Sequence, residues 1–298
     1  MMIENSRGYK VFTVINYIIL TLLALLCFLP LLNVLAMSFS DRSATAAGSV
    51  TFWPVNFTVE AYKYVLQDDG FLKSLLVSFI RVILGGGLNL ILTVMCAYPL
   101  SKESSNFRGR TIYVWIFLFA SLFNGGLIPT YIVVSETNLI NSIFSLVIPG
   151  AVPVFHVILM LNFFRGIPKE LEEAAVIDGA GHWKILWQVY IPLSKASVAT
   201  VTLFSLVNHW NSWFDGMIYM NDTAKQPLAT FLHNKVVVSG LDIMINTNDM
   251  DTLQQLLTIS DQTTKAAQIF LAMLPILCVY PFLQKYFTKG VIVGSVKG

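Results

Sequence analysis

The feature that most constrains the fold is a run of 27 predominantly apolar residues near the N-terminus, residues 11–37. A helix that spans a membrane needs about 20 such residues, whereas the apolar region of a signal peptide has about 7–15. We therefore predict an uncleaved membrane-spanning helix. The composition agrees, because 12% of the 298 residues are charged, whereas an average soluble domain has about 25%.

Five further apolar runs follow, separated by polar segments. Glycine and proline inside these runs are compatible with membrane helices, because small residues allow close packing and neighbouring helices satisfy the freed backbone groups. We predict an all-α integral membrane protein with a single transmembrane domain over residues 1–298. Its six spans are expected at about residues 11–37, 75–100, 111–134, 142–164, 196–217 and 266–286.

The basic residues predict the orientation of these spans. An even number of spans places both termini on one side, together with residues 101–110 and 165–195. These segments hold twelve Lys and Arg residues, whereas the longer segments on the opposite side hold six. Because cytoplasmic segments carry the excess of basic residues, we predict that both termini and residues 165–195 are cytoplasmic.

Within residues 165–195, the stretch 170–192 is the most polar and least lipid-like segment between two apolar runs. Pro168 suits the first position of a helix, where its missing N–H would have no partner. Gly179 and Gly181 are expected to end this helix, since glycine readily takes the left-handed conformation found there. Negative charge in the first turns suits the helix dipole, and it is supplied by Glu170, Glu172 and Glu173.

A second surface helix is predicted over residues 182–189 and is expected to stop at Pro192, which lacks an N–H. Trp183, Leu186 and Trp187 recur on it at helical spacing. Two interpretations explain this pattern equally well. Trp is enriched at bilayer interfaces, and an apolar helix face also fits the groove of a partner protein.

The spacing in this segment resembles the EAA loop of binding-protein-dependent ABC importer permeases. The family pattern is E-A-A, three residues, G, nine residues and I-x-L-P. The matching residues are Glu173, Ala174, Ala175, Gly179, Val189, Ile191 and Pro192, with Val189 and Ile191 as conservative departures. Three other segments resemble the carbohydrate-importing branch of the same family: WPVNFTVEAYKYVL, FNGGLIPTYIVV and the tail YFTKGVIVGSVKG.

The resemblance implies the transmembrane domain of a type I ABC importer in a bacterial cytoplasmic membrane. It implies that the EAA loop, residues 165–195, sits in a cleft of an ATPase subunit, whose closure rocks the spans between inward-open and outward-open states. Gly179 would be the hinge between the two surface helices. The coupling positions implied are Glu173, Ala174, Ala175, Asp178, Gly179, Ala180, Trp183 and Pro192.

The same resemblance implies the partners. They are a second permease chain that forms a heterodimer with this one, two ATPase subunits that bind ATP and Mg, and an extracytoplasmic solute-binding protein. The transported solute would be a carbohydrate, which we expect to be an oligosaccharide. The polar segment 221–264 would face outside and contact the binding protein.

Motifs for catalysis and for metal or nucleotide binding are absent from the sequence. It contains no GxxxxGK[ST], HExxH, CxxC or nucleophile elbow, and its four histidines show no ligand spacing. We therefore predict a non-catalytic chain with no metal site and no bound cofactor. The net charge of +2 is uninformative about partners, no basic patch in the sequence suggests nucleic acid, and membrane lipid is the expected surrounding.

The fifth span carries the candidates for the substrate path. Polar groups within a span usually face the bundle interior or a wet cavity, and aromatic faces combined with amides suit sugar rings. An aromatic belt at the outer interface is an alternative that explains Trp210 better than it explains the polar neighbours. The candidates are Asn208, His209, Trp210 and Asn211.

Arg81 lies in the second span, near its outer end. It is either a functional charge inside the membrane or a side chain that snorkels to the interface, and we favour snorkelling. Two alternatives to a sugar importer are considered. An ion-coupled secondary transporter requires internal repeats and intramembrane charges, and the other alternative is an ABC permease for a non-sugar solute.

Overall fold

The computed structural model describes residues 7–103, 107–235 and 262–295. Every element within these residues is a helix, so the predicted all-α class is confirmed. The chain divides into two compact units. Unit 1 comprises residues 1–69 and 234–274, and unit 2 comprises residues 70–233 and 275–298.

Unit 1 contains α1 (Arg7–Ser38), α2 (Arg42–Ala46), α3 (Glu60–Gln67) and the first part of α16 (Gln262–Ser295). The segment after α1 folds back on the end of that helix, where Asn33 Nδ2 donates a hydrogen bond to the Thr51 carbonyl at 2.6 Å. Asp41 caps α2 by accepting a hydrogen bond from the Ser43 N–H at 3.1 Å. Much of the predicted outer segment 221–264 lies outside the described residues.

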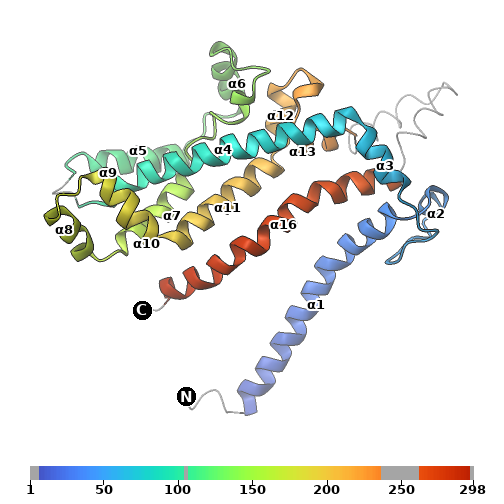
Figure 1. Cartoon of the computed structure of the whole chain (residues 1–298), viewed down its shortest axis with the longest axis horizontal. Helices are drawn as coiled ribbons and strands as arrows, with labels where there is room; N and C mark the ends of the chain where they lie inside the picture. Colours follow the sequence, from blue (N-terminus) through green and yellow to red (C-terminus); the bar gives the residue numbers. More distant parts are fainter. Residues whose placement is uncertain (1–6, 104–106, 236–261, 296–298) are drawn as a thin grey trace. The chain divides into compact units, whose positions relative to one another are not determined.

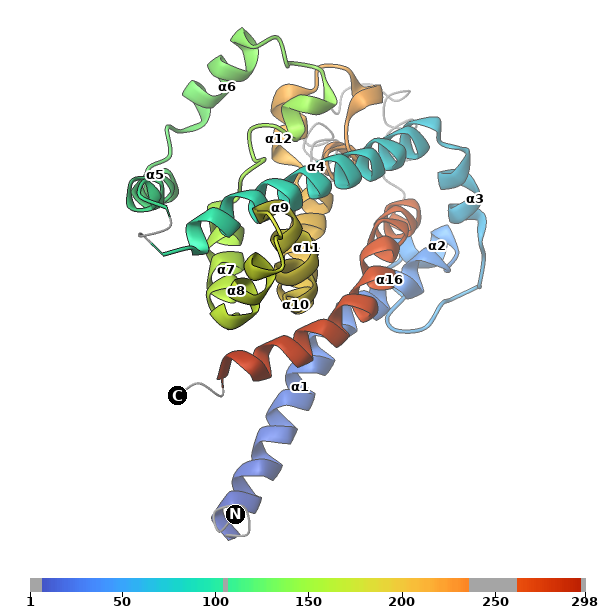
Figure 2. The same ribbon diagram turned by 60° about the vertical axis from the view of Figure 1, so that its left-hand side comes forward.

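Unit 2 is built around α4 (Asp69–Ser101), the long cyan helix of Figure 1. Figure 2 shows α7 (Val154–Arg165) and α11 (Lys195–Asn211) on the same side of α4. The elements of the unit other than α4 are α5 (Arg110–Leu122), α6 (Leu127–Glu136), η1 (Ile143–Leu146), α7 (Val154–Arg165), α8 (Lys169–Ile177), α9 (His182–Ile185), η2 (Leu186–Tyr190), α10 (Ile191–Leu193), α11 (Lys195–Asn211), α12 (Phe214–Tyr219), η3 (Thr223–Lys225), α13 (Leu228–His233) and the second part of α16.

Small residues let α4 and α11 approach closely. A Cβ atom added to Gly85 would lie 2.5 Å from the imidazole of His209, so only glycine leaves room for that ring. Trp210 packs edge-on against Phe79 of α4, with 5.3 Å between the ring centroids. Gly85 and Gly86 therefore act as the packing surface that small residues provide in membrane helices.

Arg81 of α4 does not snorkel, contrary to the preferred prediction. Its side chain is 2% exposed, and its Nη1 atom donates to the Ser212 carbonyl at 3.0 Å and to Asp215 Oδ1 at 3.1 Å. Arg81 Nη2 also forms an ion pair with Asp215 Oδ2. The counter-charge lies 134 positions away in the sequence, and it compensates the desolvation that would otherwise drive the guanidinium to the surface.

The predicted third span is broken into α5 and α6, which meet at an angle of 114°. Gly126 between them has a φ of +90°, and its N–H donates to Asn124 Oδ1 at 2.9 Å. Within the predicted fourth span, residues 142–164, the α-helix covers only Val154–Arg165, because Pro149 and Pro153 cannot donate backbone hydrogen bonds. The predicted fifth span ends as a helix at Asn211 and resumes in α12.

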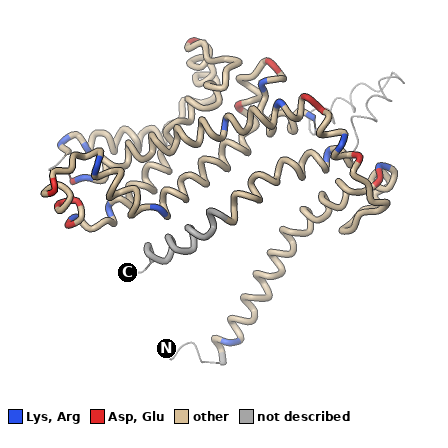
Figure 3. The backbone as a smooth tube through the Cα atoms, in the orientation of Figure 1, with Lys and Arg blue, Asp and Glu red and all other residues tan. Residues whose placement is uncertain are grey.

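Within the described residues, three helices are long and apolar enough to cross a membrane: Gly8–Ser38, Asp69–Ser101 and Gln262–Pro281. The count rises to five if each of two bent helix pairs forms one span, and α7 is a shorter apolar helix. The six-span topology and its orientation stay predictions. In unit 2, charged residues gather at the α8–α9 end and near α12, and few lie between (Figure 3), as expected for a segment that crosses lipid.

Candidate functional site

The EAA loop begins with α8 and a tight turn that follows it. Gly179 has a φ of +76°, a left-handed conformation that favours glycine. Its N–H donates to the Val176 carbonyl, and the Ala180 N–H donates to the Ala175 carbonyl, both at 2.9 Å. This pair of hydrogen bonds is the Schellman motif that satisfies the last carbonyls of a helix. The turn at Gly179 that the sequence predicts is therefore confirmed.

The second helix of the loop runs further than predicted. It continues from α9 through the π-helical segment η2 into α10 and ends at Leu193, so the expected stop at Pro192 is wrong. The Ile191 N–H donates to the Leu186 carbonyl, which is the wider spacing of a π turn. This wider turn directly precedes Pro192 and accommodates a ring that would clash within a regular α-helix.

The loop has an inward and an outward face. Ala175 and Ala180 pack against a buried core formed by α4, α7, η2 and α11. Leu186 and Tyr190 are buried in the same core. The loop is therefore fixed to the body of unit 2 by this face.

The outward face carries most of the predicted coupling positions. Ile177 is 85% exposed and Trp183 is 63% exposed. Exposed side chains on this face also include Glu173, Ala174, Asp178, Trp187 and Pro192. The structure thus brings apolar and acidic groups together on the accessible side of one loop.

A polar cluster joins the inward face of α8 to the end of α4. Lys102 Nζ lies 2.5 Å from Glu172 Oε1 and 3.1 Å from Tyr190 Oη. Tyr190 Oη donates to Glu172 Oε2 at 2.6 Å. The Lys102 ammonium also lies over two aromatic rings, 4.1 Å from the centroid of Tyr98 and 4.3 Å from that of Tyr190.

These contacts set the ionisation of the cluster. Burial opposes ionisation of Glu172, but the hydrogen bonds from Lys102 and Tyr190 and the Lys102 charge outweigh it and hold the pKa of Glu172 below its usual value. Burial and the neighbouring Glu172 carboxylate raise the pKa of the Tyr190 phenol. Glu172 is therefore a carboxylate and Tyr190 a neutral donor at neutral pH.

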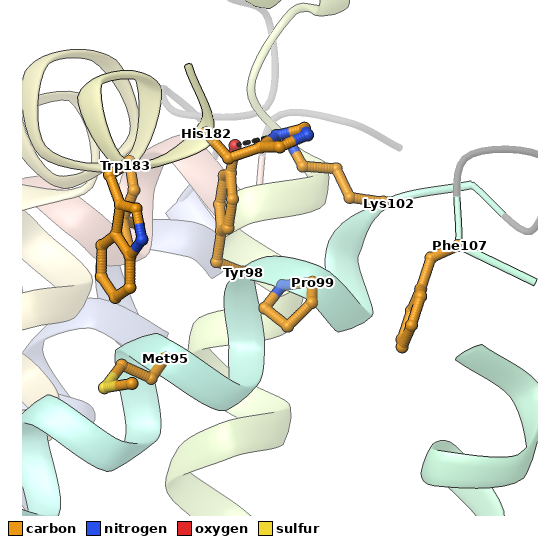
Figure 4. A pocket seen from close by; sticks show the side chains of 8 residues that line it. Met95, Tyr98, Pro99, Lys102, Phe107, His182 and Trp183 are labelled. Carbon is orange, nitrogen blue, oxygen red and sulfur yellow. Dashed lines mark hydrogen bonds between the residues drawn. The ribbon is translucent and has the colours of Figure 1, made fainter. Parts of the chain in front are cut away.

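Two hollows flank the loop. One hollow, about 340 Å³ in volume, is lined mainly by apolar side chains from α4 and α9, including Met95, Pro99 and Trp183 (Figure 4). Polar groups also line it, and Tyr98 Oη lies 3.4 Å from His182 Nδ1. The other, about 850 Å³, is lined by polar and apolar surface in about equal amounts, and its residues include Glu173 and Arg165. Glu173 thus lies on an open cleft.

The four substrate-path candidates separate into two pairs. Asn208 and Asn211 are exposed, whereas His209 and Trp210 are buried within unit 2. His209 packs on Gly85, and Trp210 packs on Phe79. The structure gives His209 and Trp210 packing partners on α4 and leaves Asn208 and Asn211 accessible on α11. Lining of a substrate path stays a prediction for all four.

Sequence reasoning missed Lys102, Glu172 and Tyr190 as members of the site. One signal was present for Glu172, because it precedes Ala175 by three residues and therefore shares its face of the helix. Lys102 lies 70 positions before Glu172, and no local pattern connects the two. Within the described residues, no group of three or more His, Cys, Asp or Glu could hold a metal ion.

Comparisons with known proteins place this site in a known context. No family model matches the chain. The chain is 39% identical to the protein LplC of Bacillus subtilis over 295 residues, which cover 99% of this chain and 98% of the relative. It is 37% identical over 290 residues to the polygalacturonan/rhamnogalacturonan transport system permease protein YtcP of the same organism, covering 97% of this chain and 99% of the relative.

A solved structure agrees with these relatives. The crystal structure of a bacterial ABC transporter involved in the import of the acidic polysaccharide alginate contains a chain that is similar to this one with a TM-score of 0.84 and 34% identity. The match covers 95% of this chain and 98% of that chain. The secondary-transporter and non-sugar alternatives are therefore not supported. This chain belongs to the carbohydrate ABC importer permeases, the multi-pass subunits of the cytoplasmic membrane.

Proposed function

We propose that this chain imports acidic oligosaccharides as one transmembrane subunit of an ATP-driven importer, with the EAA loop as the element that receives movement from an ATPase subunit. The observation that carries the proposal is the outward face of the loop. It presents Ile177, 85% exposed, and Trp183, 63% exposed, beside the exposed carboxylates of Glu173 and Asp178. Contiguous exposed apolar surface marks an interaction site, and we propose that these side chains contribute to one.

A protein partner fits this face better than lipid does. Burying Ile177 and Trp183 in a bilayer interface would bring the carboxylates of Glu173 and Asp178 toward a surface that attracts basic groups. A protein groove instead accommodates an apolar helix face and supplies basic side chains for its carboxylates. Small Ala174 leaves room for close approach. We propose Gly179 as the hinge because its left-handed backbone separates α8 from the helix that follows.

The proposed complex contains a second, different permease chain, two ATPase subunits that hold ATP and Mg, and an extracytoplasmic binding protein. This chain would supply no catalytic residue, and ATP hydrolysis would take place on the partner subunits. The family to which the chain belongs supports this division of labour.

The proposed substrate class rests on two relatives. One, 37% identical, is named for the transport of polygalacturonan and rhamnogalacturonan, and the other, 34% identical, belongs to an importer of an acidic polysaccharide. Galacturonan chains are built from sugar acids. We therefore propose an oligosaccharide with uronic acid residues rather than a neutral one.

The test is uptake into proteoliposomes that contain the complete complex, with the binding protein and ATP supplied. We expect ATP-dependent uptake of a labelled oligogalacturonide and little uptake of a neutral oligosaccharide of the same length. Uptake of the neutral sugar alone would refute the proposed substrate class. Uptake that needs no ATPase subunit and follows an ion gradient would refute the proposed function itself.

A further inference from the structure

Lys102 lies at the carboxyl end of α4 in a cage of two tyrosine rings and one carboxylate. Its side chain is 10% exposed, and its ammonium contacts Glu172 at 2.5 Å and Tyr190 at 3.1 Å. The rings of Tyr98 and Tyr190 lie 4.1 Å and 4.3 Å from it. Since its three neighbours come from α4, α8 and η2, this one side chain connects three elements of the site.

A second ion pair between the same segments offers a contrast. Lys169 of α8 pairs with Glu103, but the two side chains are 69% and 59% exposed. Exposed pairs contribute little because water and salt screen them and both side chains must be ordered. The caged pair is less exposed, with side chains 10% and 20% exposed, and its geometry is fixed by Tyr190, which bonds to both partners. It is therefore the stiffer of the two connections.

The end of α4 is also held by the helices on either side of it. Arg110 Nε donates to the Leu100 carbonyl at 3.1 Å, and Arg165 Nη2 contacts the same oxygen at 3.5 Å. Cations at this position are favoured by the negative end of the helix dipole. The carboxyl end of α4 is thus a point where α5, α7 and α8 are joined.

We propose that Lys102 is the positioning residue through which a displacement of α8 reaches α4, so that the loop and the second span move as one piece. The inference rests on the proposed function, in which an ATPase subunit moves α8. It goes beyond that function by naming the span that receives the movement and the side chain that delivers it. Without the Lys102 connection, α8 shifts against α4 and less of its displacement reaches the span.

The experiment measures the number of sugar molecules transported per ATP hydrolysed by the complete reconstituted complex. Lys102→Met keeps most of the side-chain length and removes the charge. We expect the ratio to fall by roughly tenfold, within the range typical of coupling between two sites. The charge exchange Lys102→Glu with Glu172→Lys is expected to recover a substantial part of the ratio. A merely structural role would lower assembly, or transport and hydrolysis together, and leave the ratio unchanged.

The matched control is Glu103→Gln, which removes the exposed ion pair with Lys169 and should leave the ratio unchanged. If Lys102→Met prevents assembly, Tyr190→Phe takes its place, because it removes both hydroxyl contacts and keeps the packed ring. A wild-type ratio in Lys102→Met and Tyr190→Phe complexes would overturn the inference. That outcome is distinct from failure of the proposed function, in which the wild-type complex itself would show no ATP-dependent transport.

Discussion

The Lys102 ammonium and the Glu172 carboxylate meet at 2.5 Å although 70 positions separate them in the sequence. Their contact fixes the inward face of the EAA loop to the end of α4, while Glu173, the next residue, points to the accessible side. Two adjacent glutamates thus have different environments. One holds the loop in place, and the other is free to meet a partner.

Acid should weaken the connection between the loop and α4. The folded-state pKa of Glu172 is below its usual value of 4.5, so the stabilisation is fully present above about pH 4.5 and is lost as the pH falls through the lower folded-state value. The check is the melting temperature of the purified complex against pH, for wild type and for Glu172→Gln. We expect the difference between them to be largest near neutral pH and to narrow in acid. A constant difference across that range would contradict the assignment.

The left-handed backbone at Gly179 predicts a position-specific effect of alanine. Gly179→Ala should destabilise the turn by about 1–2 kcal/mol because a Cβ atom disfavours that conformation. No atom lies within 4 Å of the added Cβ, so the effect comes from the backbone alone. Gly181→Ala is the matched control, because Gly181 has a φ of −75° and equally open surroundings. Thermal unfolding of the two variants measures the difference, and equal melting temperatures would show that the φ of Gly179 carries no strain.

The contact between Gly85 and His209 predicts a different kind of alanine effect. The added Cβ of Gly85→Ala would lie 2.5 Å from the imidazole, so α4 and α11 must separate or the ring must move, which typically costs about 1–3 kcal/mol. Gly87→Ala on the same helix meets no atom within 4 Å and should be tolerated. The yield and melting temperature of the two variants give the comparison. Equal loss in both would indicate a general effect of alanine in this span rather than a packing clash.

The buried pair of Arg81 and Asp215 predicts strong non-additivity. Asp215→Asn removes the counter-charge of a guanidinium that is 2% exposed, and breaking a buried pair in this way costs about 3–5 kcal/mol. Replacing both residues with Arg81→Met and Asp215→Asn leaves no buried charge, so the double variant should be more stable than Asp215→Asn alone. A double-mutant cycle on melting temperature tests this, and simple addition of the two losses would contradict the pairing.

The sequence predicted those features that have a local cause. Hydropathy located the apolar helices, and the left-handed turn at Gly179 followed from residue type. The break between α5 and α6 falls on the Asn-Gly-Gly sequence at residues 124–126. In contrast, the π turn before Pro192 depends on how a particular backbone accommodates a proline ring, and the sequence argument placed the helix end too early.

The contacts that sequence reasoning missed join distant positions. Arg81 was expected to snorkel because Asp215 lies 134 residues away, beyond the reach of any periodic pattern. Lys102 was counted only as a basic loop residue that sets orientation. The predicted coupling positions came from resemblance, whereas the buried residues that contact the loop were identified only once the folded arrangement was known.

The central claim is that the outward face of the EAA loop receives the movement of an ATPase subunit. The most direct measurement is binding-protein-stimulated ATP hydrolysis by the complex, purified through this chain, with Glu173→Ala compared with wild type. Glu136→Ala is the matched control, because Glu136 is also exposed and lies on the predicted extracytoplasmic side. We predict that Glu173→Ala loses the stimulation or the ATPase subunits while Glu136→Ala retains both. Full stimulation and full transport in the Glu173→Ala complex would contradict the account.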